Sequence, residues 1–125
     1  MIHIDTSALI AAFTRDRPAL PILRRFIADG ERVAICTLVL YEWERGPRTS
    51  GELEAQERLF PAAAAVVFGA REASLAASLY RNLKRPRGRE IDLAIAACAI
   101  AHGAALWTLN AADFRDLADL TVVSG

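Results

Sequence analysis

The chain has 125 residues, of which 54% are hydrophobic, and its 15 basic residues balance its 15 acidic ones. This length and apolar content exclude intrinsic disorder and predict a single domain over residues 1–125. A net charge of zero excludes a polycation that adheres to nucleic acid over its whole surface, so binding of this kind would need a local patch.

Apolar strands and helices alternate along the chain, and no turn residues indicate a β-hairpin. We expect strands at 1–4, 33–36, 64–68, 105–108 and 120–123. We expect helices at 8–13, from Asp16 to Gly30, at 38–45 after Thr37, at 52–60 after a Ser50 cap, at 70–84, and from Asp92 to Ala101. This alternation predicts an α/β fold around a mainly parallel sheet of about five strands.

The helix that begins near Asp92 is the most informative stretch. No polar side chain occurs from Leu93 to Ala101, so this helix needs cover on all sides. Asp92 therefore stands at the start of a buried helix, where a carboxylate requires helix N–H groups, a cation or a metal to offset its desolvation.

Other acidic and polar residues are expected beside Asp92. Asp5 follows the first strand directly, Glu42 lies early in the helix after the second, and Asn110 and Asp113 follow the strand at 105–108. The carboxyl ends of parallel strands open into one crevice, so these groups should gather there. Hydroxyl groups at the same strand ends could support them: Thr6, Ser7 and Thr108.

Clustered carboxylates repel one another, and a divalent cation reverses the sign of that interaction. Hard oxygen ligands suit Mg²⁺ or Mn²⁺, and no spacing of Cys and His offers a zinc site. Such a centre suits hydrolysis of a phosphodiester bond. We assign Asp5 and Asp92 as main metal ligands, Glu42 as a ligand or water-orienting base, Asp113 as the fourth charged member, and Asn110 as a support.

Four stretches in order resemble PIN-domain nucleases, and most of all the VapC-type toxins of bacterial toxin–antitoxin pairs. They are Ile2-His3-Ile4-Asp5-Thr6-Ser7-Ala8-Leu9, Tyr41-Glu42, Asp92 before an Ala-rich helix ending in His102-Gly103, and Leu106-Trp107-Thr108-Leu109-Asn110 with Asp113-Phe114. The resemblance implies a three-layer α/β/α sandwich, a metal-dependent endoribonuclease and catalytic roles for Asp5, Glu42 and Asp92. It also implies a homodimer and a small VapB-like antitoxin, through which alone DNA would be bound. PIN domains usually place an acid where this chain has Asn110.

Each acid also has a purely structural interpretation. Asp5 and Asp92 are common helix caps, Glu42 can pair with Arg45, and Asp113 can shape a turn. These interpretations do not explain why all four acids fall at one edge of the expected sheet. A non-catalytic PIN-fold module that binds RNA or serves as a scaffold remains the alternative hypothesis.

A basic stretch precedes Asp92. Five of the 15 basic residues fall within nine positions, and they are candidates for guiding an RNA backbone: Arg81, Lys84, Arg85, Arg87 and Arg89. The alternative is a solvated loop partly paired with Glu90. Neither a signal peptide nor a membrane span is expected, since the apolar run after Asp92 is about half the ~20 residues that a bilayer requires. We therefore expect a cytoplasmic protein.

Overall fold

The computed structural model describes residues 1–124. Four short strands form a fully parallel sheet in the order β2-β1-β3-β4: β1 Ile2–Ile4, β2 Val33–Ala34, β3 Ala105–Trp107 and β4 Val122–Val123. The register aligns Ile2 with Val33 and with Ala105, so β1, β2 and β3 run level with one another. Their carboxyl ends therefore lie along one edge of the sheet.

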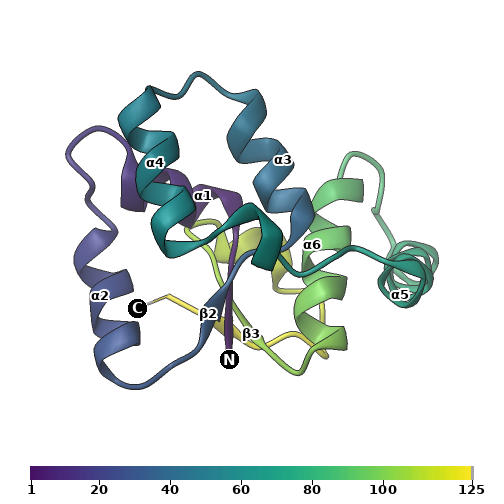
Figure 1. Ribbon diagram of the computed structural model, residues 1–125. Helices are drawn as coiled ribbons and strands as arrows, with labels where there is room; N and C mark the ends of the chain where they lie inside the picture. The colour runs from purple at the N-terminus through teal and green to yellow at the C-terminus, as the bar shows by residue number, and fades with distance from the viewer. Residues whose placement is uncertain (125) are drawn as a thin grey trace.

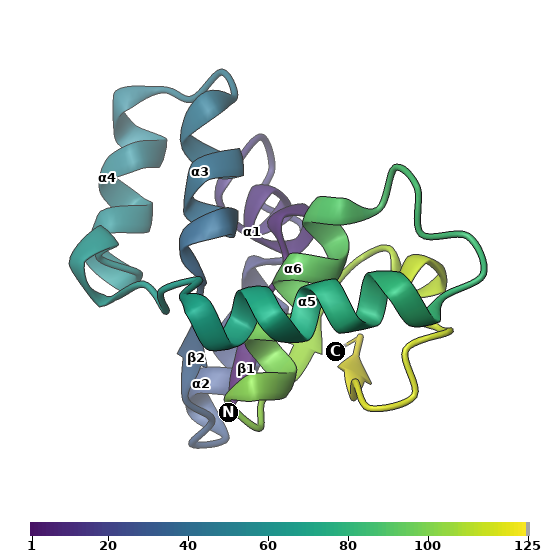
Figure 2. The same ribbon diagram turned by 90° about the vertical axis from the view of Figure 1, so that its right-hand side faces the viewer.

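Helices cover both faces of this sheet. Their bounds are α1 Thr6–Phe13, α2 Leu20–Ala28, α3 Thr37–Arg45, α4 Ser50–Leu59, α5 Ala70–Asn82 and α6 Glu90–Ala101, with short 3₁₀ turns η1 Ala62–Ala64 and η2 Ala111–Phe114. Figure 1 and Figure 2 show α2 on one face, α6 on the other and α5 outside α6. The three-layer α/β/α sandwich is thus confirmed, with four strands in residues 1–124 instead of about five.

The helix α6 occupies the centre of the domain. Every residue from Leu93 to Ala99 is buried, because β3 lies on one side of the helix and α5 on the other. Small alanine side chains allow this close approach of neighbouring elements from all directions. The predicted absence of a solvent face holds for this run, whereas Ile100 and Ala101 are partly exposed.

The predicted strand at 64–68 is wrong. Residues 62–64 form η1, and only Val66 makes a β-bridge, an isolated parallel one to Cys36, which follows β2. The reason lies in the partner segment, which turns into α3 at Thr37 and leaves too little extended chain to pair with. The Thr37 hydroxyl instead accepts a hydrogen bond from the Phe68 N–H, at 3.1 Å.

Most predicted helix starts lie one or two residues from the observed ones, and the structure explains the differences at the second helix and at the cap of α4. The second helix begins at Leu20 with Pro21 in its first turn, not at Asp16, because Arg15 and Arg17 adopt positive φ angles of 55° and 53° that a right-handed helix cannot contain. The cap of α4 is Thr49, not Ser50. Its hydroxyl accepts from the Glu52 N–H at 3.1 Å, and the Glu52 carboxylate accepts from the Thr49 N–H at 2.8 Å.

Candidate functional site

The helices α1 and α3 lie beyond the carboxyl ends of the strands, and α6 begins at the same end of the domain (Figure 1). This placement follows from the chain path, because α1 and α3 begin almost directly where β1 and β2 end. It brings Asp5, Glu42, Asp92 and Asp113 to one region, where the environment of each carboxylate can be described in turn.

Asp5 is a buried carboxylate held by hydroxyl groups. Its side chain is 5% exposed, and its Oδ2 accepts hydrogen bonds from Thr108 Oγ1 at 2.7 Å and from Ser7 Oγ at 3.1 Å. Asp5 occupies the N-cap position of α1 but makes no side-chain capping bond, so capping does not account for its presence. Burial raises the pKa of Asp5, although the hydroxyl contacts oppose the shift.

Glu42 faces Asp5 from α3. Its Oε1 accepts a hydrogen bond from Thr6 Oγ1 at 2.5 Å, which ties α3 to the first residue of α1. Its Oε2 lies 3.6 Å from the Arg45 guanidinium. The ion pair expected from the structural interpretation is therefore present, and Glu42 belongs to the acidic region as well, because its charge contributes to the raised pKa of Asp5.

Asp92 is the third residue of α6 and has no polar partner. Within residues 1–124 its carboxylate makes no hydrogen bond or ion pair, and the N-cap position of α6 belongs to Arg89. Burial raises the pKa of Asp92, the charges of Asp5, Asp113 and Glu42 raise it further, and the charge of Arg89 opposes the shift without reversing it. Arg89 makes no hydrogen bond to this carboxylate, so a bound cation would stabilise a half-buried Asp92 among three other acids.

The fourth position involves the turn after β3. Asn110 donates its backbone N–H to Thr108 Oγ1 at 3.0 Å, and its carbonyl accepts from the Asp113 N–H at 2.9 Å. The side chains of both residues are exposed and make no hydrogen bond within the described chain. The charge of Asp113 contributes to the raised pKa of Asp92. Asn110 makes its observed hydrogen bonds through its backbone, and these bonds shape the turn.

The four acids share an electrostatic environment without forming a closed ligand set. In residues 1–124, no three carboxylate, imidazole or thiolate groups are placed close enough to hold a metal as they stand. Carboxylates repel one another when no cation lies between them, and Mg²⁺ takes only one or two carboxylates directly while it retains several waters. The unpartnered Asp92 and the all-oxygen donor set fit a hard dication of this kind.

A family model described as the PIN domain matches residues 2–120. The chain belongs to the PIN-domain family. This confirms the resemblance read from the four sequence stretches.

Solved structures share the fold of this PIN domain. One is a chain of VapBC2 from Rickettsia felis bound to a DNA fragment from their promoter, with 22% identity, a TM-score of 0.78 and 98% of each chain covered. A second is DNA-bound VapBC from Salmonella typhimurium, with 20% identity, a TM-score of 0.80 and coverage of 98% of this chain and 96% of that one. A third is a toxin-antitoxin complex from Klebsiella pneumoniae, with 23% identity, a TM-score of 0.75 and coverage of 99% and 97%. No curated protein is a significant match.

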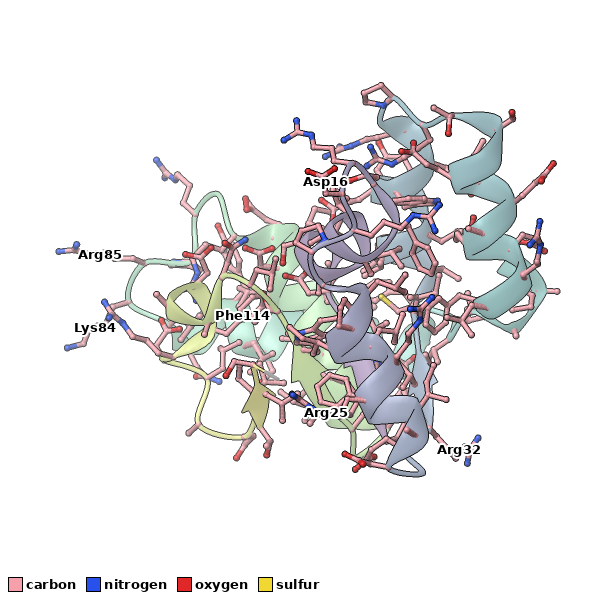
Figure 3. All side chains as sticks on the ribbon, turned by 90° about the vertical axis from the view of Figure 1, so that its left-hand side faces the viewer. Asp16, Arg25, Arg32, Lys84, Arg85 and Phe114 are labelled. Atoms are coloured by element: carbon pink, nitrogen blue, oxygen red, sulfur yellow. The ribbon has the colours of Figure 1, made fainter. Side chains whose placement is uncertain are left out.

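The predicted basic residues of the PIN domain divide into two groups. Arg81, Lys84, Arg85 and Arg87 are exposed and make no ion pair within residues 1–124, and Figure 3 shows Lys84 and Arg85 pointing away from the domain. Arg89 differs, because its guanidinium makes an ion pair with Asp116 at 2.7 Å. Asp116 was not among the predicted site residues, and no sequence pattern marked it, since its partner lies on another element.

Proposed function

We propose that this protein is a VapC-type toxin, a metal-dependent endoribonuclease that hydrolyses phosphodiester bonds of RNA. The observation that carries the proposal is Asp92, a carboxylate with a raised pKa, no polar partner and three acidic neighbours. Family membership supports it, because the matched model spans residues 2–120 and thus includes all four acids.

The roles follow from the environment of each side chain. Asp5 and Asp92 would hold Mg²⁺ or Mn²⁺, with Asp113 as the further charged member. When bound, such a dication supplies Lewis-acid activation of water and neutralises charge that develops on the phosphate. Glu42, held through one oxygen by Thr6, would orient the attacking water and accept its proton. Ser7 and Thr108 fix Asp5, and the Asn110 backbone fixes the turn.

RNA is the proposed substrate class because cationic residues directly precede α6, the helix that carries Asp92. The loop before α6 carries Lys84, Arg85 and Arg87, with Arg81 at the end of α5, and these side chains are free to contact phosphates. A neutral protein would use such a local patch to bring the backbone of a polyanion to its metal site.

The proposed partners are a VapB-like antitoxin and a second copy of this chain. The solved neighbours support this, since their descriptions name VapBC and toxin-antitoxin complexes, two of them with DNA. An arginine of the antitoxin would suit the acidic region, because a guanidinium matches carboxylates in geometry and charge. DNA contact would then belong to the antitoxin. We place the protein in the cytoplasm, where its RNA substrate is found; no helix in residues 1–124 is long and apolar enough to span a membrane.

A second candidate function is a non-catalytic PIN-fold module that binds RNA or serves as a scaffold. Asn110 favours it, because an amide stands at the early fourth position and supplies no charge. The lack of a closed ligand set in residues 1–124 points the same way. The two functions differ in whether a dication and Asp92 are required.

Incubation of purified protein with total RNA tests the proposal. We expect cleavage with Mn²⁺, none with EDTA, and a loss of about a hundredfold or more for Asp92→Asn, as for removal of a metal ligand or its close support. Asp119→Asn is the matched control, since Asp119 is an exposed acid near Met1, at the opposite edge of the sheet. Induction of the wild-type chain alone should arrest growth, whereas Asp92→Asn should not. Cleavage that persists in EDTA, or equal activity of Asp92→Asn, would favour the non-catalytic module or a contaminant.

A further inference from the structure

Arg89 makes three hydrogen bonds from one guanidinium. Its Nη1 donates to Asp116 Oδ2 at 2.8 Å, and its Nη2 donates to Asp116 Oδ1 at 2.7 Å and to the backbone oxygen of Asp113 at 2.9 Å. These contacts join the N-cap residue of α6 to Asp113, within the turn η2, and to Asp116, which follows that turn. Arg89 therefore connects the segment that presents Asp92 with the segment that presents Asp113.

The pair with Asp116 has the two-pronged geometry that only arginine provides. Two parallel N–H donors meet the two oxygens of one carboxylate, which fixes the plane of the guanidinium as well as its position. The hydrogen bonds raise the pKa of Arg89 and lower that of Asp116, so both groups stay charged. A lysine could keep the charge at this place but could not make the three contacts together.

The same guanidinium interacts electrostatically with the carboxylates of Asp92 and Asp113, yet it forms a hydrogen bond with neither carboxylate. Without Asp116, the nearest anionic partners of Arg89 would be these two acids. A guanidinium bound to them would compete with a dication for the same oxygens. By pairing with Arg89, Asp116 thus prevents the guanidinium from pairing with the carboxylates of Asp92 and Asp113.

We infer that Arg89 is a positioning residue: it holds the Asp113 turn against the start of α6, while Asp116 keeps its guanidinium off the Asp92 and Asp113 carboxylates. The metal-related part of this inference rests on the proposed function. It replaces the prediction that Arg89 contacts RNA, because a phosphate would have to displace a two-pronged carboxylate that the chain itself supplies.

The charge-conserving substitution Arg89→Lys tests the inference, with Arg87→Lys as the matched control on an exposed, unpaired residue two positions away. We expect Arg89→Lys to weaken Mn²⁺ binding by about tenfold in calorimetry, as loss of an outer contact does at metal sites. The Asp113 amide, which donates to Asn110, should exchange its hydrogen faster in the metal-free variant. The KM for RNA should stay unchanged while kcat falls. Arg87→Lys should alter neither Mn²⁺ affinity nor exchange.

A second set of variants separates positioning from a simple effect of charge. Asp116→Asn should weaken Mn²⁺ binding because the Arg89 guanidinium would then pair with the carboxylates of Asp92 and Asp113. In the background of Arg89→Ala, the same Asp116→Asn change should have no further effect. If the two changes are additive, Asp116 acts through its charge alone and the part of the inference that concerns it is overturned.

The results also distinguish this inference from the proposed function. If the wild type binds no Mn²⁺ and cleaves no RNA, the proposed function fails, and the exchange rate of the Asp113 amide still decides whether Arg89 holds the turn. If the wild type binds and cleaves, but Arg89→Lys leaves Mn²⁺ affinity and exchange unchanged, the inference is overturned. A raised KM with a weaker salt dependence of RNA binding would identify Arg89 as an RNA contact.

Discussion

Among individual residues, Asp92 and Asp5 illustrate two ways of keeping a carboxylate in a protein interior. Hydroxyl groups of Ser7 and Thr108 stabilise Asp5, while nothing in the described chain donates to Asp92. Both pKa values are raised, first by burial. The folded chain therefore holds a charge at Asp92 that destabilises it when no cation is bound.

Removal of that charge should stabilise the metal-free protein. The pKa of Asp92 in the folded chain lies above its ordinary value of 3.8, so the folded state binds the extra proton more tightly and loses this advantage as pH rises through the raised value. In EDTA, Asp92→Asn should therefore melt at a higher temperature than the wild type at pH 7. The difference should shrink toward pH 4.

Melting temperatures measured between pH 4 and pH 8 check this expectation. Asp119→Asn, which leaves the acidic region intact, is the control measured over the same range. A lower melting temperature for Asp92→Asn at pH 7 would mean that the Asp92 carboxylate stabilises the metal-free fold.

For whole helices and strands, the predictions are correct where the sequence of a single segment decides its structure. The run from Leu93 to Ala99 is buried in the structure because an unbroken apolar helix can be accommodated only in the core. The prediction of a strand at 64–68 was wrong because such a strand needs an extended partner, and the partner segment turns into α3 at Thr37. Asp5 could be placed at a strand end from sequence, whereas the Arg89–Asp116 pair required the tertiary structure.

The cap of α4 provides a test of one corrected element. Thr49 and Glu52 bond reciprocally to each other's backbone N–H groups, so Thr49→Ala should lower the free energy of unfolding by about 1 kcal/mol. Ser50→Ala is the control, because Ser50 is the first residue inside the helix and makes no capping bond. Chemical denaturation measures both. An equal loss from Ser50→Ala would return the cap to the position predicted from sequence.

For the molecule as a whole, the fold gathers acids that lie far apart in the sequence. Parallel strands in level register place Asp5 and Thr108 within hydrogen-bonding distance, although they are 103 positions apart. A metal bound between such segments would bind only the folded chain.

Mn²⁺ should therefore stabilise the whole domain by mass action. At a free concentration 100 times its Kd, the expected gain is about 2.7 kcal/mol in the free energy of unfolding, visible as a higher melting temperature. Asp5→Asn should lose most of this gain and keep its fold, since an amide oxygen can still accept the hydroxyl bonds. Equal gains in both proteins would place the bound ion elsewhere.

The level register of β1 and β3 has a consequence for biosynthesis. Asp5 is synthesised 103 positions before Thr108, whose hydroxyl group donates to its carboxylate, and Asp113 is synthesised later still. A nascent chain or a prematurely terminated product thus lacks the assembled acidic region. Under the proposed function, the ribosome that synthesises this nuclease is not exposed to its activity until translation of the domain is nearly complete.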